Sequence, residues 1–434
     1  MYPNPADVLA FPPRPHLEQY KKRAQALVTA CKSGERDAIR TWAADWIESL
    51  ASALTTSDGD LRARFDQRVN QIEDFAWKTL SASDRRTAIC TLADAQFVIA
   101  RVHGFKSWPH CARHINALTR TTSPISRFES AVEAVITGDM AALRRLLRAS
   151  PALIRARSPR DHQATLLQYV AANGVEGFRQ KTPENAVDVA KLLLGAGADV
   201  DAPNWPDGPA GPGTTLGEVA TSAHPARAGV QIPLMQTLLD YGANINGLPG
   251  GWNPLLAALH NGRREAAEFL AARGARLDLE GAAGVGRLDV VQTFFNRDGT
   301  LRNATNAQME SGFEWACEYG RNDVVEFFLD RGADLRAGEK TNQTGLHWAV
   351  IGGELETVKL LLKRGAPLEA TNVYGGTVLG QATWCVINGD RSIDYVPIIR
   401  ALLAAGARIE EADYPTGNKR VDDLLRPVRG HDVR

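Results

Sequence analysis

A short phrase that ends in Gly-Ala recurs six times between residues 196 and 407, and it limits the possible folds more than any other feature. The copies are Ala196–Ala198, Tyr241–Ala243, Arg273–Ala275, Arg331–Ala333, Arg364–Ala366 and Ala405–Ala407. A degenerate copy lies at 298–300, and from it the next two glycines follow at intervals of 33 residues. A period near 33 residues predicts a stack of repeated helix pairs, in which each pair is stabilised by its neighbours.

The clearest unit runs from Thr344 to Ala366. It opens with Thr-Gly-Leu-His-Trp-Ala-Val, continues through a Gly-Gly turn and a leucine-rich stretch at 358–362, and closes with Gly-Ala. The threonine can cap a first helix, and a glycine suits the left-handed conformation that ends a second one. This unit resembles the ankyrin repeat. The resemblance covers roughly residues 125–434 and implies an all-α solenoid of about eight units with a C-terminal cap helix.

Residues 16–120 lack the repeated phrase and show helical periodicity instead. Apolar residues recur at helical spacing from Leu17 onward, and four tryptophans, at 42, 46, 77 and 108, indicate a packed helical domain. The stretch 92–109 resembles a helical extension that precedes ankyrin arrays in many bacterial proteins. We therefore expect an N-terminal helical domain over 1–122 and an ankyrin-repeat domain over 125–434. The resemblance also implies a bacterial, cytoplasmic protein.

The composition limits the partners. Lys plus Arg and Asp plus Glu both number 50, and this balance argues against a general nucleic-acid or membrane-surface binder. No apolar run approaches the roughly 20 residues that span a bilayer, so we expect no membrane association. The cysteines lie far apart without a C-x-x-C motif, which favours reduced thiols in the cytoplasm. They are Cys31, Cys90, Cys111, Cys317 and Cys385.

The chain lacks the common catalytic phrases, such as G-x-S-x-G, H-E-x-x-H, the P-loop and the dinucleotide fingerprint. His110 and His114 are spaced so that a helix would place both on one face, as a metal site needs. No third ligand is evident near them, so a helix surface or an interdomain contact is the favoured reading. We expect neither a metal nor a cofactor.

Candidate binding residues come from aligning the first helix of each unit, which lines the concave groove in ankyrin arrays. The alignment places in the groove Trp315, Trp348, Trp384, Tyr169, Glu218, His260 and Glu318. The loops between repeats add three aromatic residues, Trp205, Trp252 and Tyr374. Exposed aromatic side chains are typical of binding hot spots, although tryptophans can equally pack between repeats.

The favoured function is a non-catalytic recognition scaffold that holds a protein segment or another extended ligand in the tryptophan-lined groove. An unusual enzyme, an isomerase, cyclase or hydrolase, is the alternative. In that reading the small residues at 280–286 would leave a hollow for a small molecule, and Glu318, His260 or Glu218 would transfer protons. A third possibility, a regulator that binds nucleic acid through its N-terminal helices, is weakened by the acidic residues there.

Overall fold

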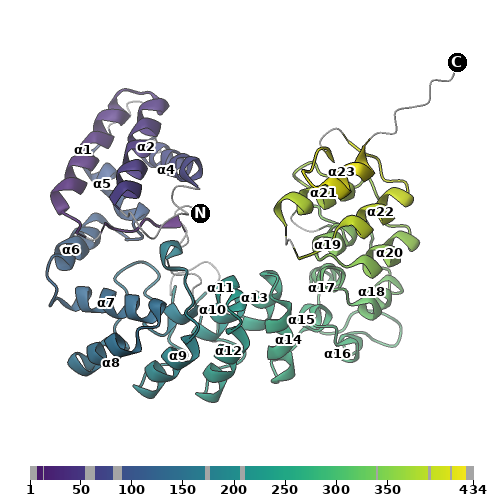
Figure 1. Ribbon diagram of the computed structural model, residues 1–434. Helices are drawn as coiled ribbons and strands as arrows, with labels where there is room; N and C mark the ends of the chain where they lie inside the picture. The colour runs from purple at the N-terminus through teal and green to yellow at the C-terminus, as the bar shows by residue number, and fades with distance from the viewer. Residues whose placement is uncertain are drawn as a thin grey trace. The chain divides into compact units, whose positions relative to one another are not determined.

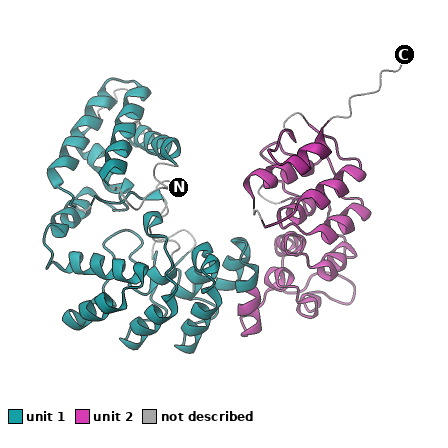
Figure 2. Cartoon of the chain, viewed as in Figure 1, with its two compact units in different colours: residues 1–266 teal, residues 267–434 magenta. Residues whose placement is uncertain are grey.

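A computed structural model gives the architecture (Figure 1). It describes residues 7–12, 14–53, 64–81, 90–171, 176–205, 211–338, 341–389, 392–410 and 413–426. These residues form helices and loops, with three isolated β-bridges and no longer strand among them. They divide into two compact units, unit 1 over residues 1–266 and unit 2 over residues 267–434 (Figure 2). The predicted all-α fold is therefore confirmed, whereas the predicted division at 122–125 stays a prediction.

Unit 1 begins with five amphipathic helices. They are α1 (Leu17–Lys32), α2 (Arg36–Ala53), α4 (Phe65–Ser81), α5 (Leu92–Val102) and α6 (Trp108–Leu118). Their apolar faces share one core, whose buried members lie between Leu9 and Ile115. The segment before α1 belongs to this core, because the Leu9 amide donates to the Val102 carbonyl at 2.9 Å. The front helices thus have an apolar core of their own within unit 1.

A disulfide joins Cys31 at the end of α1 to Cys90 just before α5, with their Cα atoms 6.2 Å apart. The prediction of five reduced thiols is therefore wrong for this pair. Spacing in the sequence could not reveal it, because helix packing brings together two cysteines that are far apart along the chain. The three remaining cysteines are free and buried. Because disulfides are rare in the cytoplasm, the pair also removes one reason for expecting a cytoplasmic location.

The repeats of unit 1 follow, and two of them are irregular. The elements are α7 (Pro124–Thr137), α8 (Met140–Ala149), η2 (Pro151–Arg155), η3 (Gln168–Ala171), η4 (Gly177–Arg179), α9 (Ala186–Gly195), α10 (Thr215–Thr221), α11 (Ala223–Arg227), α12 (Gln231–Asp240) and α13 (Pro254–His260). In the second repeat a 3-10 turn, η3, stands where a first helix is expected. In the third, the extra helix α11 separates α10 from α12, which accounts for the irregular turn region in the sequence.

Helix α14 (Arg264–Ala272) contains the boundary between the units, and unit 2 continues with regular pairs. They are α15 (Leu279–Gly284) with α16 (Leu288–Gln292), α17 (Asn306–Glu318) with α18 (Asn322–Leu329), α19 (Gly345–Ile351) with α20 (Leu355–Lys363), and α21 (Val378–Asn388) with α22 (Val396–Ala404). A last helix, α23 (Lys419–Leu425), packs on α22 and buries Val421 and Leu425. This helix lies where the sequence predicted the cap.

The six Gly-Ala phrases have one geometry. Each glycine follows the second helix of a repeat with φ between 84° and 98°. The amide of the following alanine donates to a carbonyl five residues earlier, at 3.0 Å in every copy. This left-handed helix end, a Schellman motif, satisfies carbonyls that the helix leaves unpaired. Each copy of the phrase therefore ends the second helix of its repeat.

The glycine- and alanine-rich helix α15 is closely packed. Its residues Gly281, Ala282, Ala283 and Gly284 are buried, and a Cβ atom added to Gly312 of α17 would lie 3.2 Å from the Cβ of Ala283. The small side chains therefore let α15 and α17 approach each other. The structure does not support the expected hollow at this helix.

Candidate functional site

Three neighbouring inner helices of unit 2 carry one tryptophan each. Trp315 lies on α17, Trp348 on α19 and Trp384 on α21, and these helices pack side by side in this order. Trp384 is 56% exposed, whereas Trp315 and Trp348 are half-buried. Trp315 and Trp348 hold equivalent places in their repeats, and Trp384 lies three residues later in its own repeat, which is close to the same side of an inner helix. We call Trp315, Trp348, Trp384, Glu314 and Glu318 the inner face of unit 2.

Trp348 has a packing role as well as an exposed edge. Its ring contacts the core of unit 2, and its Nε1 atom is buried without a hydrogen-bond partner among the described residues. An indole N–H usually finds a partner when it is buried. The sequence left open whether Trp348 packs between repeats or is exposed for binding. The structure shows part of each, since the ring fills space between repeats and still borders the surface.

The repeat that carries Trp384 exposes other apolar side chains as well. Ile387, three residues later on the same helix, is 53% exposed. In the loop before α21, Val373 and Tyr374 are 58% and 80% exposed. Tyr374 thus lies at an exposed loop tip, as the sequence suggested. Large exposed apolar side chains that gather on one part of a surface are characteristic of binding sites.

Glu318 gives the inner face an unusual carboxylate. It is half-buried at the end of α17, and it makes no hydrogen bond or ion pair within the part of the chain that the structure describes. Burial, with a smaller contribution from the negative charge of Glu314, raises the pKa of Glu318 to about 7. A nearby cation would reverse this shift, because an opposite charge favours the ionised carboxylate.

An acidic hollow of about 390 Å³ opens on the same helix. Its floor includes Met309 and Phe313, and its walls carry Glu310, Glu314 and Asp334. One cation, Arg331, also borders it, but its guanidinium lies only 3.5 Å from the ring centroid of Phe327. The hollow therefore offers an apolar floor and an excess of carboxylates.

The remaining groove candidates belong to unit 1 and are placed differently. His260 is exposed at the end of α13, whereas Glu218 and Tyr169 are both only 1% exposed. Glu218 accepts a hydrogen bond from the Asn204 amide, and burial raises its pKa well above the usual value. The expectation that Glu218 and Tyr169 line an open groove is wrong, because both side chains are buried. Glu318 lies in the other unit, and nothing supports the enzyme alternative.

Trp205 and Trp252 are half-buried rather than exposed at loop tips. The Trp205 amide donates to the His162 carbonyl at 3.1 Å, and its indole lies 5.9 Å from the imidazole of His162. Trp252 lies against Gly213, where an added Cβ atom would come within 2.3 Å of the indole. Both indoles therefore hold neighbouring loops together, and this packing corrects the expectation that they extend a binding surface.

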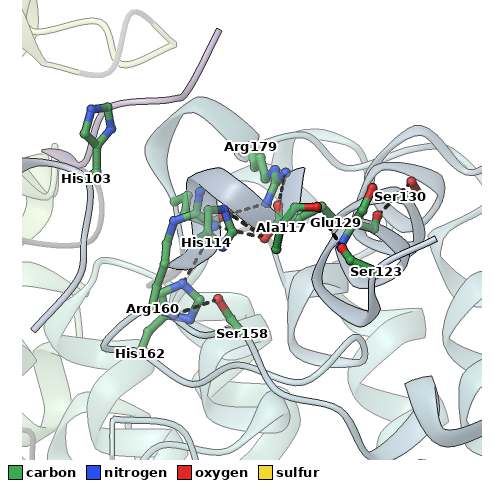
Figure 3. A network of polar contacts seen from close by, with 12 residues as sticks. His103, His114, Ala117, Ser123, Glu129, Ser130, Ser158, Arg160, His162 and Arg179 are labelled. Carbon is green, nitrogen blue, oxygen red and sulfur yellow. Dashed lines mark hydrogen bonds and ion pairs between the residues drawn. The ribbon is translucent and has the colours of Figure 1, made fainter. Parts of the chain in front are cut away.

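Unit 1 also contains a polar cluster that the sequence did not predict (Figure 3). Nη1 of Arg160 lies 2.9 Å from Oε1 of Glu176 and 3.3 Å from Oε1 of Glu129. Arg179 closes the ring, with Nη1 3.1 Å from Oε2 of Glu176 and Nη2 2.6 Å from Oε2 of Glu129. We call these four residues the buried charge cluster. It ties α7 to the loop after η2 and to η4.

The two arginines and the two glutamates of the cluster neutralise one another, as in a structural network of ion pairs. Oε1 of Glu176 also accepts a hydrogen bond from the Tyr169 hydroxyl at 3.0 Å and lies 3.0 Å from Nε2 of His162. Burial acts to raise the pKa of Glu176, but the charges of Arg160 and Arg179 outweigh it, and the pKa falls well below its usual value. A carboxylate that is ionised and fully paired is a poor proton carrier near neutral pH.

The front helices contact the cluster. His114 of α6 lies 3.9 Å from Glu129, and the Arg160 guanidinium lies 5.5 Å from the ring centroid of Phe105. Burial lowers the pKa of His114 to about 3, so this imidazole is neutral. His110 is exposed instead and hydrogen-bonds to Ser107. Among the described residues there is no group of three side chains able to hold a metal ion.

Two family models agree with this architecture. A family model described as ankyrin repeats (3 copies) matches residues 282–413, and a second, ankyrin repeats (many copies), matches residues 226–271. The ankyrin repeat domain of human ASB11 is a similar solved structure, with 22% identity and a TM-score of 0.29 over 56% of this chain and 99% of that one. A search of curated proteins found no match. The chain is an ankyrin-repeat protein.

Ankyrin repeats generally serve as scaffolds for protein interactions. No helix among the described residues combines the length and the apolar character that crossing a bilayer requires.

Proposed function

We propose that this protein is a recognition scaffold and that the inner face of unit 2 binds a segment of a partner protein. The observation that carries the proposal is the exposure of Trp384, which is 56% exposed on α21; this helix packs against α19 with Trp348, and α19 packs against α17 with Trp315. An indole that stays in water adds no hydrophobic stabilisation to the folded state. Tryptophan is, however, among the residues most often found at the centre of protein interfaces.

The charges beside the indoles indicate the chemistry of the bound segment. Glu310, Glu314 and Glu318 recur every four residues on α17 and so share one side of that helix. Two of them border the acidic hollow, whose apolar floor suits the aliphatic part of a lysine or arginine side chain. We therefore infer that the segment is basic and carries at least one large apolar residue next to its cations.

Selection from a library of random peptides tests the proposal. The full chain should enrich peptides in which Lys or Arg lies close to an aromatic or aliphatic residue. Trp384→Ala should lose these peptides, whereas Tyr241→Ala, which removes a 47% exposed aromatic ring from unit 1, should retain them. Enrichment of acidic peptides, or equal enrichment by both variants, would overturn the proposal.

A further inference from the structure

A second hollow, of about 670 Å³, lies in the front helices of unit 1. It opens between α1, α2 and the segment before α1. Three cations, Arg14, Lys22 and Arg23, border it, and three aromatic residues, Tyr20, Trp42 and Trp46, also line it; we call these three its aromatic floor. Among the described residues that line it there is no carboxylate. Its volume is within the usual range for small-molecule sites, which is roughly 300–1,000 Å³.

Arg23 is the informative residue of this hollow. It is half-buried, with its guanidinium 5.3 Å from the ring centroid of Trp46. Burial lowers its pKa, and although Tyr20 and Asp45 exert weaker opposite effects, no carboxylate forms an ion pair with Arg23 within the described part of the chain. A charge that is partly removed from water without a paired countercharge raises the free energy of the folded state.

Four other shielded arginines of the same unit are paired with carboxylates. Arg68 contacts Asp7 at 2.5 Å, and Arg101 forms an ion pair with Asp161. Arg160 and Arg179 share the carboxylates of the buried charge cluster. Arg23 differs from these four, and the two cations nearest to it along the hollow, Arg14 and Lys22, also form no ion pair among the described residues.

The hollow also supplies a neutral donor and a rigid floor. The Tyr20 hydroxyl makes no hydrogen bond to any described residue, and burial raises its pKa, so it keeps its proton. Trp42 is fixed from below, because its Nε1 donates to the Arg23 carbonyl at 3.1 Å. Three cations and a hydroxyl donor suit a group with more than one negative charge, and arginine matches the geometry of phosphate oxygens.

We propose that this hollow binds a phosphorylated small molecule, with Arg14, Lys22 and Arg23 contacting its phosphate groups and the aromatic floor contacting its organic part. The volume exceeds what a single inorganic phosphate fills, and the arrangement leaves the floor accessible beside the cations. The site is independent of the inner face of unit 2, since it lies in the other unit and uses opposite charges.

Calorimetric titration of the full chain tests this site with two probes, ATP and inorganic tripolyphosphate. Both should bind. The double variant Arg14→Gln/Lys22→Gln, whose two changes are at exposed positions, should weaken both at least tenfold. The matched control Lys21→Gln/Lys32→Gln removes the same charge from exposed positions of α1 outside the hollow and should change affinity less than twofold.

Two results would overturn the proposal. One is the absence of binding by either probe at millimolar concentration. The other is an equal loss in the two double variants, since it would mean that phosphate is attracted only by the general charge of α1. Arg23→Gln serves as a second test, with circular dichroism to verify folding, and it should abolish binding of both probes while the helical signal is retained.

Discussion

At the scale of single residues, two buried or half-buried carboxylates behave in opposite ways for a simple reason. Glu176 has two arginines, a histidine and a tyrosine around it, and its pKa is lowered. Glu318 has only the repulsion of Glu314 to add to its burial, and its pKa is raised. The direction in which the pKa of a glutamate shifts therefore depends on the side chains that the fold places around it. The glutamate in the sequence does not by itself reveal that direction.

Glu176→Gln should strongly destabilise unit 1. The change removes one negative charge and leaves two arginines, Arg160 and Arg179, with the single carboxylate of Glu129. Removing one partner from a buried ion pair typically costs about 3–5 kcal/mol. Urea denaturation followed by circular dichroism measures this loss. Glu133→Gln, an exposed change on α7, is the control and should alter the free energy of unfolding by less than about 0.5 kcal/mol.

Glu318→Gln should stabilise unit 2 in a pH-dependent way. The carboxyl has a pKa of about 7 when folded and about 4.5 when unfolded, so the native state binds the extra proton between these values and stability falls as pH rises through them. The glutamine variant lacks this penalty. We expect it to exceed the original chain by about 1–2 kcal/mol at pH 8 and to match it at pH 4.5.

Urea denaturation at these two pH values measures the difference. Glu326→Gln, at an exposed site on α18, should show no such pH dependence. A gain for Glu318→Gln that is the same at both pH values would contradict the raised pKa.

At the scale of elements, the helix ends were predictable and the loop contacts were not. Each Gly-Ala phrase acts through the backbone of its own few residues, so its 3.0 Å hydrogen bond follows from local sequence. Trp252 lies against Gly213, and Trp205 lies against His162, in each case about 40 residues away along the chain. An aromatic residue in a Gly- and Pro-rich loop gives no local sign of such a neighbour.

Gly365→Ala should destabilise its repeat through backbone strain alone. The glycine has φ of 84°, and an added Cβ atom would meet nothing within 4 Å. Placing an L-residue in this conformation costs about 1 kcal/mol. Gly195→Ala is the matched control, because this glycine lies at the end of α9 without a positive φ and with equally open surroundings. Thermal unfolding should show a lower Tm for the first variant and an unchanged or higher Tm for the second.

At the scale of the whole molecule, a fixed period predicted the stack because every repeat uses the same local rules. Contacts that join different repeats, or the front helices to the repeats, fall outside those rules. The ion pairs of Arg160 with Glu129 and Glu176 span 31 and 16 residues, and the disulfide joins cysteines 59 residues apart. The three tryptophans of unit 2 could be picked out from the sequence because each lies in the first helix of its repeat.

Reduction of the disulfide should destabilise the front helices. It closes a loop across 59 residues, and removing such a link typically costs about 2–4 kcal/mol. The double variant Cys31→Ser/Cys90→Ser should show the same loss without reductant, measured as a lower urea midpoint of unit 1. If dithiothreitol left the unfolding of the original chain unchanged, the link would contribute nothing to its stability.

The most direct test of the central claim measures the affinity of one selected basic peptide for three forms of the full chain. The account predicts that Trp384→Ala weakens binding at least tenfold, a loss of about 1.4 kcal/mol, while its unfolding transition stays unchanged. Glu310→Gln/Glu314→Gln should also weaken binding, and more strongly at low salt. Unchanged affinity in both variants would contradict the claim that the inner face of unit 2 is the binding surface.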